Sequence, residues 1–174
     1  DTYRNLPISY QETTVNISMV DASVLQNFSE FAWLTGGNEN WDPVKQGSVI
    51  VSESFYNRFG LGAGDTITLD GIDGPQVVTI AAVFYDYTTE HGLIMMDRST
   101  YRRIFEDYTI DSLAIFLDPN ANRQVVVEKI KLKTTKQKLP LTNQEELHSG
   151  ILEVFDTTFA LTRSMRFLAS IVCF

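Results

Sequence analysis

The stretch "FGLGAGDTITL", residues 59–69, decides how the middle of this chain folds. Upstream of it, "SESFYNRF" predicts a short helix with Ser52 as its N-cap, because a serine oxygen accepts hydrogen bonds from the free N–H groups of a first turn. Gly60 then stands where a helix ends in a left-handed residue. Downstream, Ile67 and Leu69 alternate with threonines, which predicts a half-buried strand. The stretch therefore predicts a helix stop, a turn and a strand.

The three glycines Gly60, Gly62 and Gly64 also raise the alternative of a phosphate-binding loop. Such a loop needs a strand before its glycines and a helix after them, because the helix N-terminus supplies the N–H groups that hold the anion. Here the order is reversed, and no Lys-Ser or Lys-Thr pair follows. The local order argues against a phosphate site.

Composition restricts the class of protein. The chain has 174 residues, 44% of them hydrophobic, with 14 basic and 22 acidic side chains and a formal charge of −8. It is long and apolar enough for one globular unit. The negative charge argues against nucleic acid as a partner, since a phosphate-binding surface needs clustered cations. The basic run "KIKLKTTKQK", residues 129–138, predicts a solvated helical face, with contact to anionic headgroups or a partner as the alternative.

The first hundred residues read mainly as strands. Val15, Ile17 and Met19 alternate with polar residues and predict an early strand, and a helix is expected over residues 22–34. Residues 47–101 read as a β-rich block, in which "DGIDGP" marks a turn between two strands.

The remaining elements set the fold class. We expect a short helix over residues 98–105, a buried strand over 112–118 and a longer helix over 120–137. Strands and helices thus come before and after the β-rich block. This order predicts an α+β fold, in which a mixed α/β lobe is interrupted by an inserted β-rich lobe.

The last segment predicts a long helix. Thr142 and Glu145 have the spacing of a capping box. Apolar positions then step by four and three residues, the spacing of a seam against another long helix, and a helix through Phe174 would be about 48 Å long. The seam residues are Leu147, Ile151, Val154, Thr158, Leu161, Met165, Leu168 and Val172.

The end of this segment, "FLASIVCF", carries no charge after Arg166. A bilayer-spanning helix needs about 20 apolar residues, so these eight predict the first turns of a truncated transmembrane helix. Because the chain also starts without methionine, we expect it to be a piece of a longer protein. The alternative is an amphipathic terminal helix that folds back on the core.

No catalytic, cofactor or metal site is predicted, and we do not expect an enzyme. His91 and His148 lie far apart, and no serine stands in a nucleophile elbow. The polar loop that holds Asp86, Glu90 and His91 reads as solvated rather than as a ligand set. Cys173 is the single cysteine, which excludes an intrachain disulfide and a thiolate metal centre.

Two tryptophans are the candidates for contact with a partner or a cargo. Trp33 and Trp41 lie in an aromatic-rich region with Phe28 and Phe31. Core packing is the ordinary role of such side chains. An exposed tryptophan would instead mark a binding surface, because aromatic residues dominate binding hot spots.

Three stretches resemble the extracytoplasmic domain of FtsX/MacB-type ABC transporter permeases, a family that includes the lipoprotein-releasing permeases. They are "GSVIVSESFYNRFGLGAGDTITL", "VTIAAVFYDYTTEHGLIMMDRSTYRRIF" and the tail "ILEVFDTTFALTRSMRFLASIVCF". The resemblance covers residues 47–106 and 147–174, whereas residues 1–46 and 107–146 are similar in layout only.

The resemblance implies a domain organisation. Residues 1–46 and 102–142 would form a porter-like α/β lobe, residues 47–101 an inserted β-rich lobe, and residues 143–174 a stalk helix that leads into the membrane. It also implies a location on the periplasmic side of the bacterial inner membrane.

The resemblance further implies partners and a function. The partners would be a cytoplasmic ATP-binding subunit, a second permease, and a lipoprotein, a lipid or an accessory periplasmic protein. The function would be the coupling of ATP hydrolysis to movement outside the membrane. The alternative is an extracytoplasmic ligand-binding module of a membrane-tethered receptor.

Overall fold

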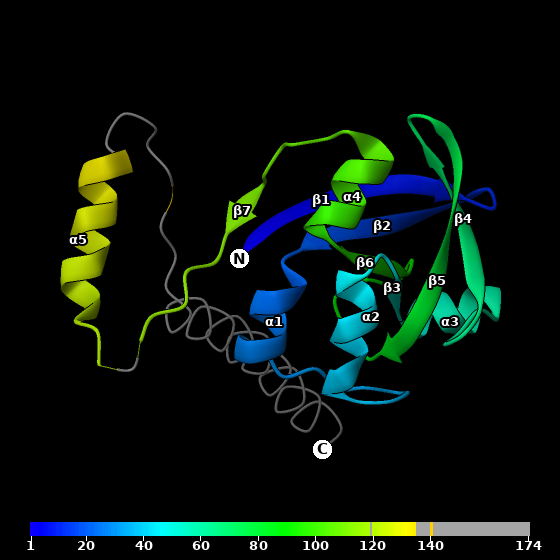
Figure 1. The fold of residues 1–174 in the computed structure, drawn as a ribbon, viewed down its shortest axis with the longest axis horizontal. Coiled ribbons are helices and arrows are strands. Elements are labelled where there is room, and N and C mark those ends of the chain that lie inside the picture. The colour runs from blue at the N-terminus through cyan, green and yellow to red at the C-terminus, as the bar shows by residue number, and fades with distance from the viewer. Residues whose placement is uncertain (119, 135–139, 141–174) are drawn as a thin grey trace, which may run out of the picture. The chain divides into compact units, whose positions relative to one another are not determined.

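The computed structural model describes residues 1–118, 120–134 and 140. The chain divides into two compact units, Asp1–Asp118 and Pro119–Phe174, and each is described by itself. The first unit confirms the mixed α/β fold, since it combines short helices with a mixed sheet (Figure 1). No helix within the described ranges is long and apolar enough to cross a bilayer.

The first unit is organised around a seven-stranded sheet with the order β4-β5-β3-β6-β2-β1-β7. β2 runs parallel to β6 and β3 runs parallel to β5, whereas the other neighbours are antiparallel. The strands are β1 (Thr2–Tyr10), β2 (Thr13–Val20), β3 (Val49–Ser52), β4 (Thr66–Gly71), β5 (Gly74–Phe84), β6 (Leu93–Asp97) and β7 (Ser112–Leu113).

Four short helices and one 3-10 turn accompany the sheet. Their sequences carry the expected start signals: Asp21 and Asp97 accept hydrogen bonds as the N-caps of the helices that follow them. These elements are α1 (Ala22–Phe28), η1 (Asn38–Asn40), α2 (Trp41–Lys45), α3 (Glu53–Phe59) and α4 (Arg98–Phe105).

The sheet is buried on both faces. In β3 the side chains of Val49 and Val51 join the core that includes residues of α3 and α4, whereas Ile50 joins the core that includes residues of α1 and α2. All four residues of β3 are buried. Its continuous apolar run is therefore typical of a central strand with both faces covered.

The middle stretch folds as the sequence predicts. The hydroxyl of Ser52 accepts a hydrogen bond from the N–H of Phe55, and Gly60 ends α3 in the left-handed region with φ of 69°. The carboxylate of Asp65 then accepts a hydrogen bond of 2.8 Å from the N–H of Gly62. Three features of the glycine stretch are thus confirmed: the N-cap, the helix stop and the turn.

The N-terminal hairpin contains a strand that periodicity did not indicate. β1 precedes the predicted strand β2, and the two are joined by a two-residue turn in which Gln11 and Glu12 have φ of 46° and 62°. A turn with two positive φ values matches the twist of the flanking strands. Neither residue is a glycine or an asparagine, so the usual sequence signal for this turn is missing.

Two element predictions are wrong. The helix expected over residues 22–34 ends at Phe28, because Phe31 and Trp33 turn into the core, where the ring of Phe31 lies 5.0 Å from that of Trp41. The buried strand expected over residues 112–118 is only the exposed pair Ser112–Leu113. This segment runs along the edge of the sheet, and no helix of the first unit buries its apolar side chains.

Strands from the two predicted lobes pair with one another in the first unit, and the division into lobes stays a prediction. β6, from the predicted insert, pairs with β2 over Asn16↔Leu93 to Val20↔Asp97 and with β3 on its other side. One sheet therefore runs through both predicted lobes, and residues 119–142 fall in the second unit. Sequence patterns locate strands but do not show which strands pair.

The helix described in the second unit is α5 (Arg123–Thr134). It has the type of structure predicted for this region, although it is shorter than the predicted range 120–137. No residue of α5 is buried, which agrees with a solvated face for its lysines. The predicted seam residues, from Leu147 to Val172, lie outside the described residues.

Ser52 offers a test of the central core. Its hydroxyl is fully buried and accepts hydrogen bonds from the N–H of Phe55 at 3.3 Å and from the N–H of Leu93 at 2.9 Å. Ser52→Ala leaves both buried donors without a partner, so we expect a loss of about 2–3 kcal/mol in the free energy of unfolding. Urea unfolding of the 174-residue chain measures this loss.

Ser54→Ala is the matched control. It removes a hydroxyl that lies 2.8 Å from that of Ser52 but leaves both backbone bonds intact. We expect a loss of at most about 1 kcal/mol. Equal losses in the two variants would contradict this account of Ser52.

Candidate functional site

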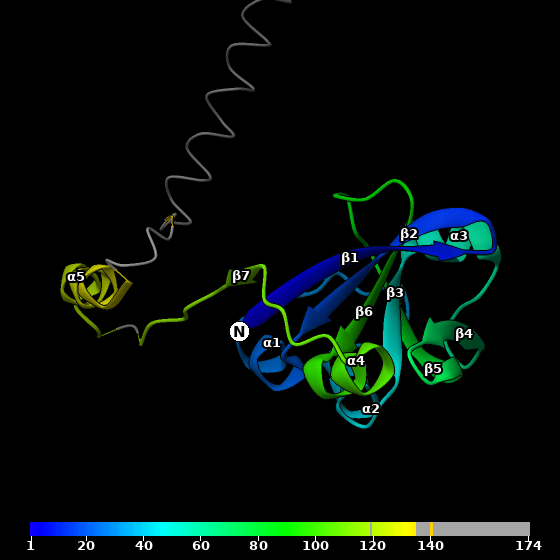
Figure 2. The same ribbon diagram turned by 90° about the horizontal axis from the view of Figure 1, so that it is seen from above.

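The candidate site is the place where the first strand lies beside the segment that leaves the first unit. β1 pairs with β7 over Thr2↔Leu113 and Tyr3↔Ser112. The backbone N–H of Ala114 donates to the carbonyl of Asp1 at 2.9 Å. Figures 1 and 2 both show β7 beside the N-terminal end of β1. We call this arrangement, residues 1–5 with residues 106–114, the root.

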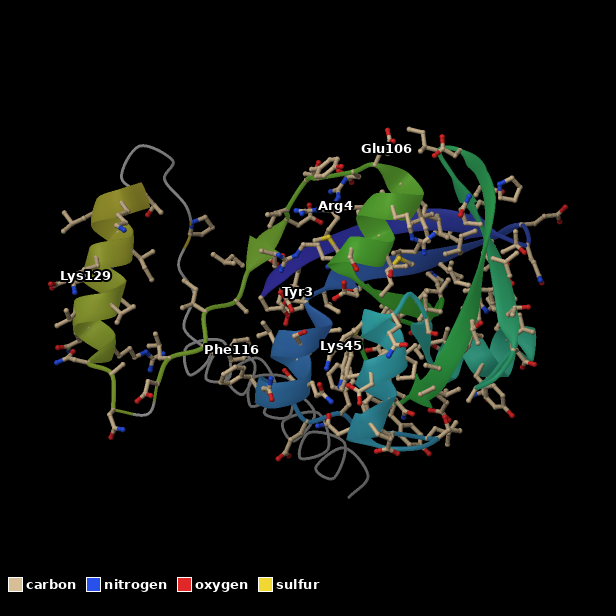
Figure 3. The ribbon with its side chains drawn as sticks, viewed as in Figure 1. Tyr3, Arg4, Lys45, Glu106, Phe116 and Lys129 are labelled. Carbon is tan, nitrogen blue, oxygen red and sulfur yellow. The ribbon has the colours of Figure 1, made fainter. Side chains whose placement is uncertain are left out.

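Arg4 joins the two halves of the root. Its Nε lies 2.9 Å from Oδ2 of Asp107, and its Nη1 lies 2.7 Å from Oδ1 of Asp111. Figure 3 shows Arg4 between β1 and the segment that follows α4. One guanidinium thus bonds to two carboxylates, an arrangement that uses the fixed fork of its donors.

Further hydrogen bonds hold both carboxylates in place. Asp107 accepts from the hydroxyl of Tyr101 and from the N–H of Thr109, each at 2.8 Å. Asp111 accepts from the backbone N–H of Asn5 at 2.8 Å. The group of Arg4, Tyr101, Asp107 and Asp111, which we call the root network, therefore connects β1, α4 and the segment after α4.

The root network shifts the pKa values of its members. Hydrogen bonds from Thr109, then from Tyr101 and Arg4, hold the pKa of Asp107 well below its usual value of 3.8. Burial, followed by the hydrogen bond to Asp107, raises the pKa of Tyr101 to about 12. Both pKa shifts extend the pH range over which Asp107 is charged and Tyr101 is protonated, the states that the hydrogen bonds require.

The root and the residues directly after it carry exposed apolar side chains. Leu113 is 60% exposed, and the ring of Phe116 stacks on that of Phe28 at 5.0 Å on the edge of α1. Figure 3 shows Phe116 beside α1. The segment after α4 is thus held by one strand pair, one charged network and one aromatic stack.

The structure separates the two candidate tryptophans. Trp41 is 0% exposed and packs between the rings of Phe31 and Trp33, so a partner contact through Trp41 is wrong. Trp41 thus has the core-packing role that is ordinary for such side chains, because Phe31 and Trp33 of the preceding loop cover its ring. Trp33 is half-buried at the margin of the same cluster, and its role in a contact stays a prediction.

No group of three or more His, Cys, Asp or Glu side chains within the described residues is arranged to hold a metal ion. Asp86 instead accepts hydrogen bonds from Thr88 and Thr89 in its own loop, and Asp97 caps α4. His148 and Cys173 lie outside the described residues.

Sequence reasoning missed the root network. Arg4 lies more than 100 positions from both Asp107 and Asp111, and none of the three belongs to a motif. The one available signal was the density of acidic residues after α4, where Glu106, Asp107 and Asp111 follow three arginines. That density of acidic residues indicates an ion pair, but it does not show which basic residue takes part.

The fold and the root define a class of structure, a mixed α/β domain whose first strand pairs with the segment that leaves it. Comparison with known proteins then gives the family. The model of the MacB-like periplasmic core domain matches residues 2–132. The chain therefore belongs to the MacB-like periplasmic core domain family.

Two relatives agree with this family. An uncharacterized ABC transporter permease protein of Mycobacterium tuberculosis is 26% identical in an alignment of 164 residues that covers 92% of this chain and 19% of that protein. The chain thus spans about a fifth of the length of this curated relative. The fold is similar to the crystal structure of the periplasmic region of MacB from Actinobacillus actinomycetemcomitans, with a TM-score of 0.57, 14% identity and coverage of 86% of this chain and 72% of that one.

The root network predicts a pH dependence of stability. Because the pKa of Asp107 is lower in the folded chain than in the unfolded chain, the unfolded state takes up a proton first as the pH falls. The stabilisation by Asp107 is therefore complete above about pH 5 and is lost as the pH falls below about 4. Asp107→Asn should lower the free energy of unfolding by about 1 kcal/mol at pH 7, because the side chain is partly solvated.

The measurement is urea unfolding of the wild-type chain and Asp107→Asn at pH 7, 5 and 3. We expect the difference between them to shrink at pH 3. Glu106→Gln is the control, because Glu106 is exposed and makes no ion pair within residues 1–118. A difference that is the same at all three pH values would contradict the role of Asp107.

Proposed function

We propose that this chain is the extracytoplasmic domain of an ABC transporter permease, and that it transmits movement between the membrane and the space outside it without catalysing a reaction. The observation that carries the proposal is the root. β7 runs antiparallel to β1, so the chain after Ala114 heads toward the side from which β1 enters. Two flanking segments at one side suit a domain placed between neighbouring membrane helices.

The charged contacts of the root suit the transfer of force. A displacement of either flanking segment acts first on β1 or on residues 106–114, which the root network joins. β1 in turn pairs with β2 along seven residues, from Arg4↔Met19 to Tyr10↔Thr13. The load therefore reaches the central sheet through a ladder of backbone hydrogen bonds rather than through a flexible loop.

Location and partners belong to the same proposal. We place the domain on the periplasmic side of a bacterial inner membrane. The family and the permease relative support this location. The partners would be a cytoplasmic ATP-binding subunit and a second permease. A lipoprotein, a lipid or an accessory periplasmic protein would contact the outer surface, with Trp33 as the proposed contact residue.

A disulfide across the root tests the proposal. Thr2 and Leu113 lie directly opposite each other in the β1–β7 pair, so Thr2→Cys with Leu113→Cys in a Cys173→Ser background would lock the root closed. A spin label at Val77, which is 68% exposed, would report the distance between the two permeases of the intact transporter. We expect ATP to change this distance equally in the locked and unlocked proteins, because the root moves as one piece.

The opposite variant loosens the root. Asp107→Ala with Asp111→Ala removes both carboxylate partners of Arg4. We expect the ATP-dependent change in distance at Val77 to broaden or disappear while ATP hydrolysis continues. Glu106→Ala is the control and should behave as the wild type. An ATP-dependent change that survives the loss of both aspartates would contradict the role of the root in coupling.

A further inference from the structure

A groove lies between strands that are distant in the sheet order. β4 is one edge of the sheet, and β1 lies near the other edge, yet residues of both line a cavity of about 420 Å³. The sheet therefore curls until these two strands face each other. The lining residues are Ile8, Ser9, Tyr10, Gln11, Leu61, Thr66, Thr68, Leu69 and Asp70.

The wall formed by β4 is held in a fixed position. The N–H of Ile72 at the tip of the β4–β5 hairpin donates to the carbonyl of Ile104 at 2.9 Å, near the end of α4. A Cβ atom on Gly71 would lie 2.7 Å from the same carbonyl oxygen, so only glycine fits this approach. The hairpin is thus fixed against the C-terminal end of α4, and this contact holds the outer edge of β4 in place beside the groove.

The wall formed by β1 has unpaired backbone groups. The two-residue turn after Tyr10 makes Tyr10↔Thr13 and Ile8↔Val15 hydrogen-bonded pairs, so the N–H and C=O of Ser9 point away from β2. Asn5 lies four residues from Ser9 and so has the same orientation in the ladder. Its N–H also points away from β2 and donates to Asp111, in agreement with this register. β7 pairs with Thr2 and Tyr3 only, so within residues 1–118 no strand covers Ser9.

The outer edge of β4 is open in the same way. The turn at residues 72–73 makes Gly71↔Gly74 and Leu69↔Gln76 the hydrogen-bonded pairs, which turns the backbone groups of Thr68 and Asp70 away from β5. β5 is the one strand that pairs with β4 in the described chain. The groove therefore runs between two open strand edges.

Open strand edges bind extended peptides, because backbone hydrogen bonds supply affinity and adjacent pockets supply specificity. The edge from Thr66 to Asp70 is about 13 Å long at 3.3 Å per residue, which suits a peptide of about four residues. Asp70 is the one charged residue of the lining, and residues 1–118 carry 17 acidic and 6 basic side chains. This charge favours a peptide with a basic residue.

We propose that this groove binds an extended, lysine- or arginine-containing peptide segment of a partner protein by strand addition. The segment lies between the edge at Ser9 and the edge at Thr68, and its basic side chain pairs with Asp70. The proposal is independent of the coupling role of the root, because none of the lining residues belongs to the root network.

Peptide titration of the 174-residue chain tests the proposal. The probe is the fluorescent pentapeptide Thr-Lys-Val-Thr-Val with blocked ends, and fluorescence anisotropy measures its binding. We expect saturable binding with a dissociation constant below about 1 mM. We also expect loss of binding when alternate peptide nitrogens of the probe are methylated, since methylation removes the donors that a strand needs.

Proline variants locate the binding to the strand edges. Ser9→Pro and Thr68→Pro each remove one outward N–H without removing a hydrogen bond of the sheet, and Pro7 already occupies such an edge position. We expect at least one of them to weaken binding tenfold or more, whereas Ser9→Ala and Thr68→Ala, which keep the N–H groups, bind as the wild type. Asp70→Asn should weaken binding of the lysine probe but not of the same probe with glutamine in place of lysine.

Three results would overturn the proposal. The first is no saturable binding by the wild type at about 1 mM probe. The second is wild-type affinity in both proline variants, with thermal unfolding showing that at least one of them is folded. The third is a wild-type dimer that Ser9→Pro converts to a monomer in sedimentation, because the groove would then hold a second copy of the chain.

Discussion

The parallel pairing of β2 with β6 is the constraint on which the rest of the structure depends. It joins residues 16–20 to residues 93–97, and more than seventy residues separate these two strands in the sequence. At the end of this pair two helices begin side by side, and their caps are shared. The carboxylate of Asp97 accepts from the N–H of Ala22 at 3.1 Å, and the guanidinium of Arg98 donates to Asp21 at 2.9 Å. Each helix start thus holds the other in place.

The two outer regions of the sheet follow from this centre. On one side β1 extends the sheet and receives the segment after α4 through Arg4, which gives the root. On the other side β3 and β5 carry β4, and the curl of the sheet brings β4 to face the far end of β1. The root and the groove therefore lie at opposite ends of β1, with the antiparallel β1–β2 ladder between them.

Local chemistry was predictable from the sequence, and long-range pairing was not. Ser52, Gly60 and the alternating Ile67 and Leu69 follow from rules that act over a few residues, and the structure confirms them. The exposed pair Ser112–Leu113 shows the limit, because an apolar run looks buried until the position of its strand in the sheet is known. The root network and the groove needed that same knowledge, since each joins residues far apart in the chain.

The aromatic cluster over α2 has an optical consequence. Trp33 and Trp41, the two indoles of the chain, lie 5.9 Å apart on one face of the sheet, and one is solvent-shielded while the other is at the margin. Tryptophan fluorescence, excited at wavelengths that tyrosine does not absorb, therefore comes from this one cluster. The fluorescence reports unfolding of the face of the sheet that α1 and α2 cover. Loss of the ion pairs of Arg4 alone leaves the spectrum unchanged.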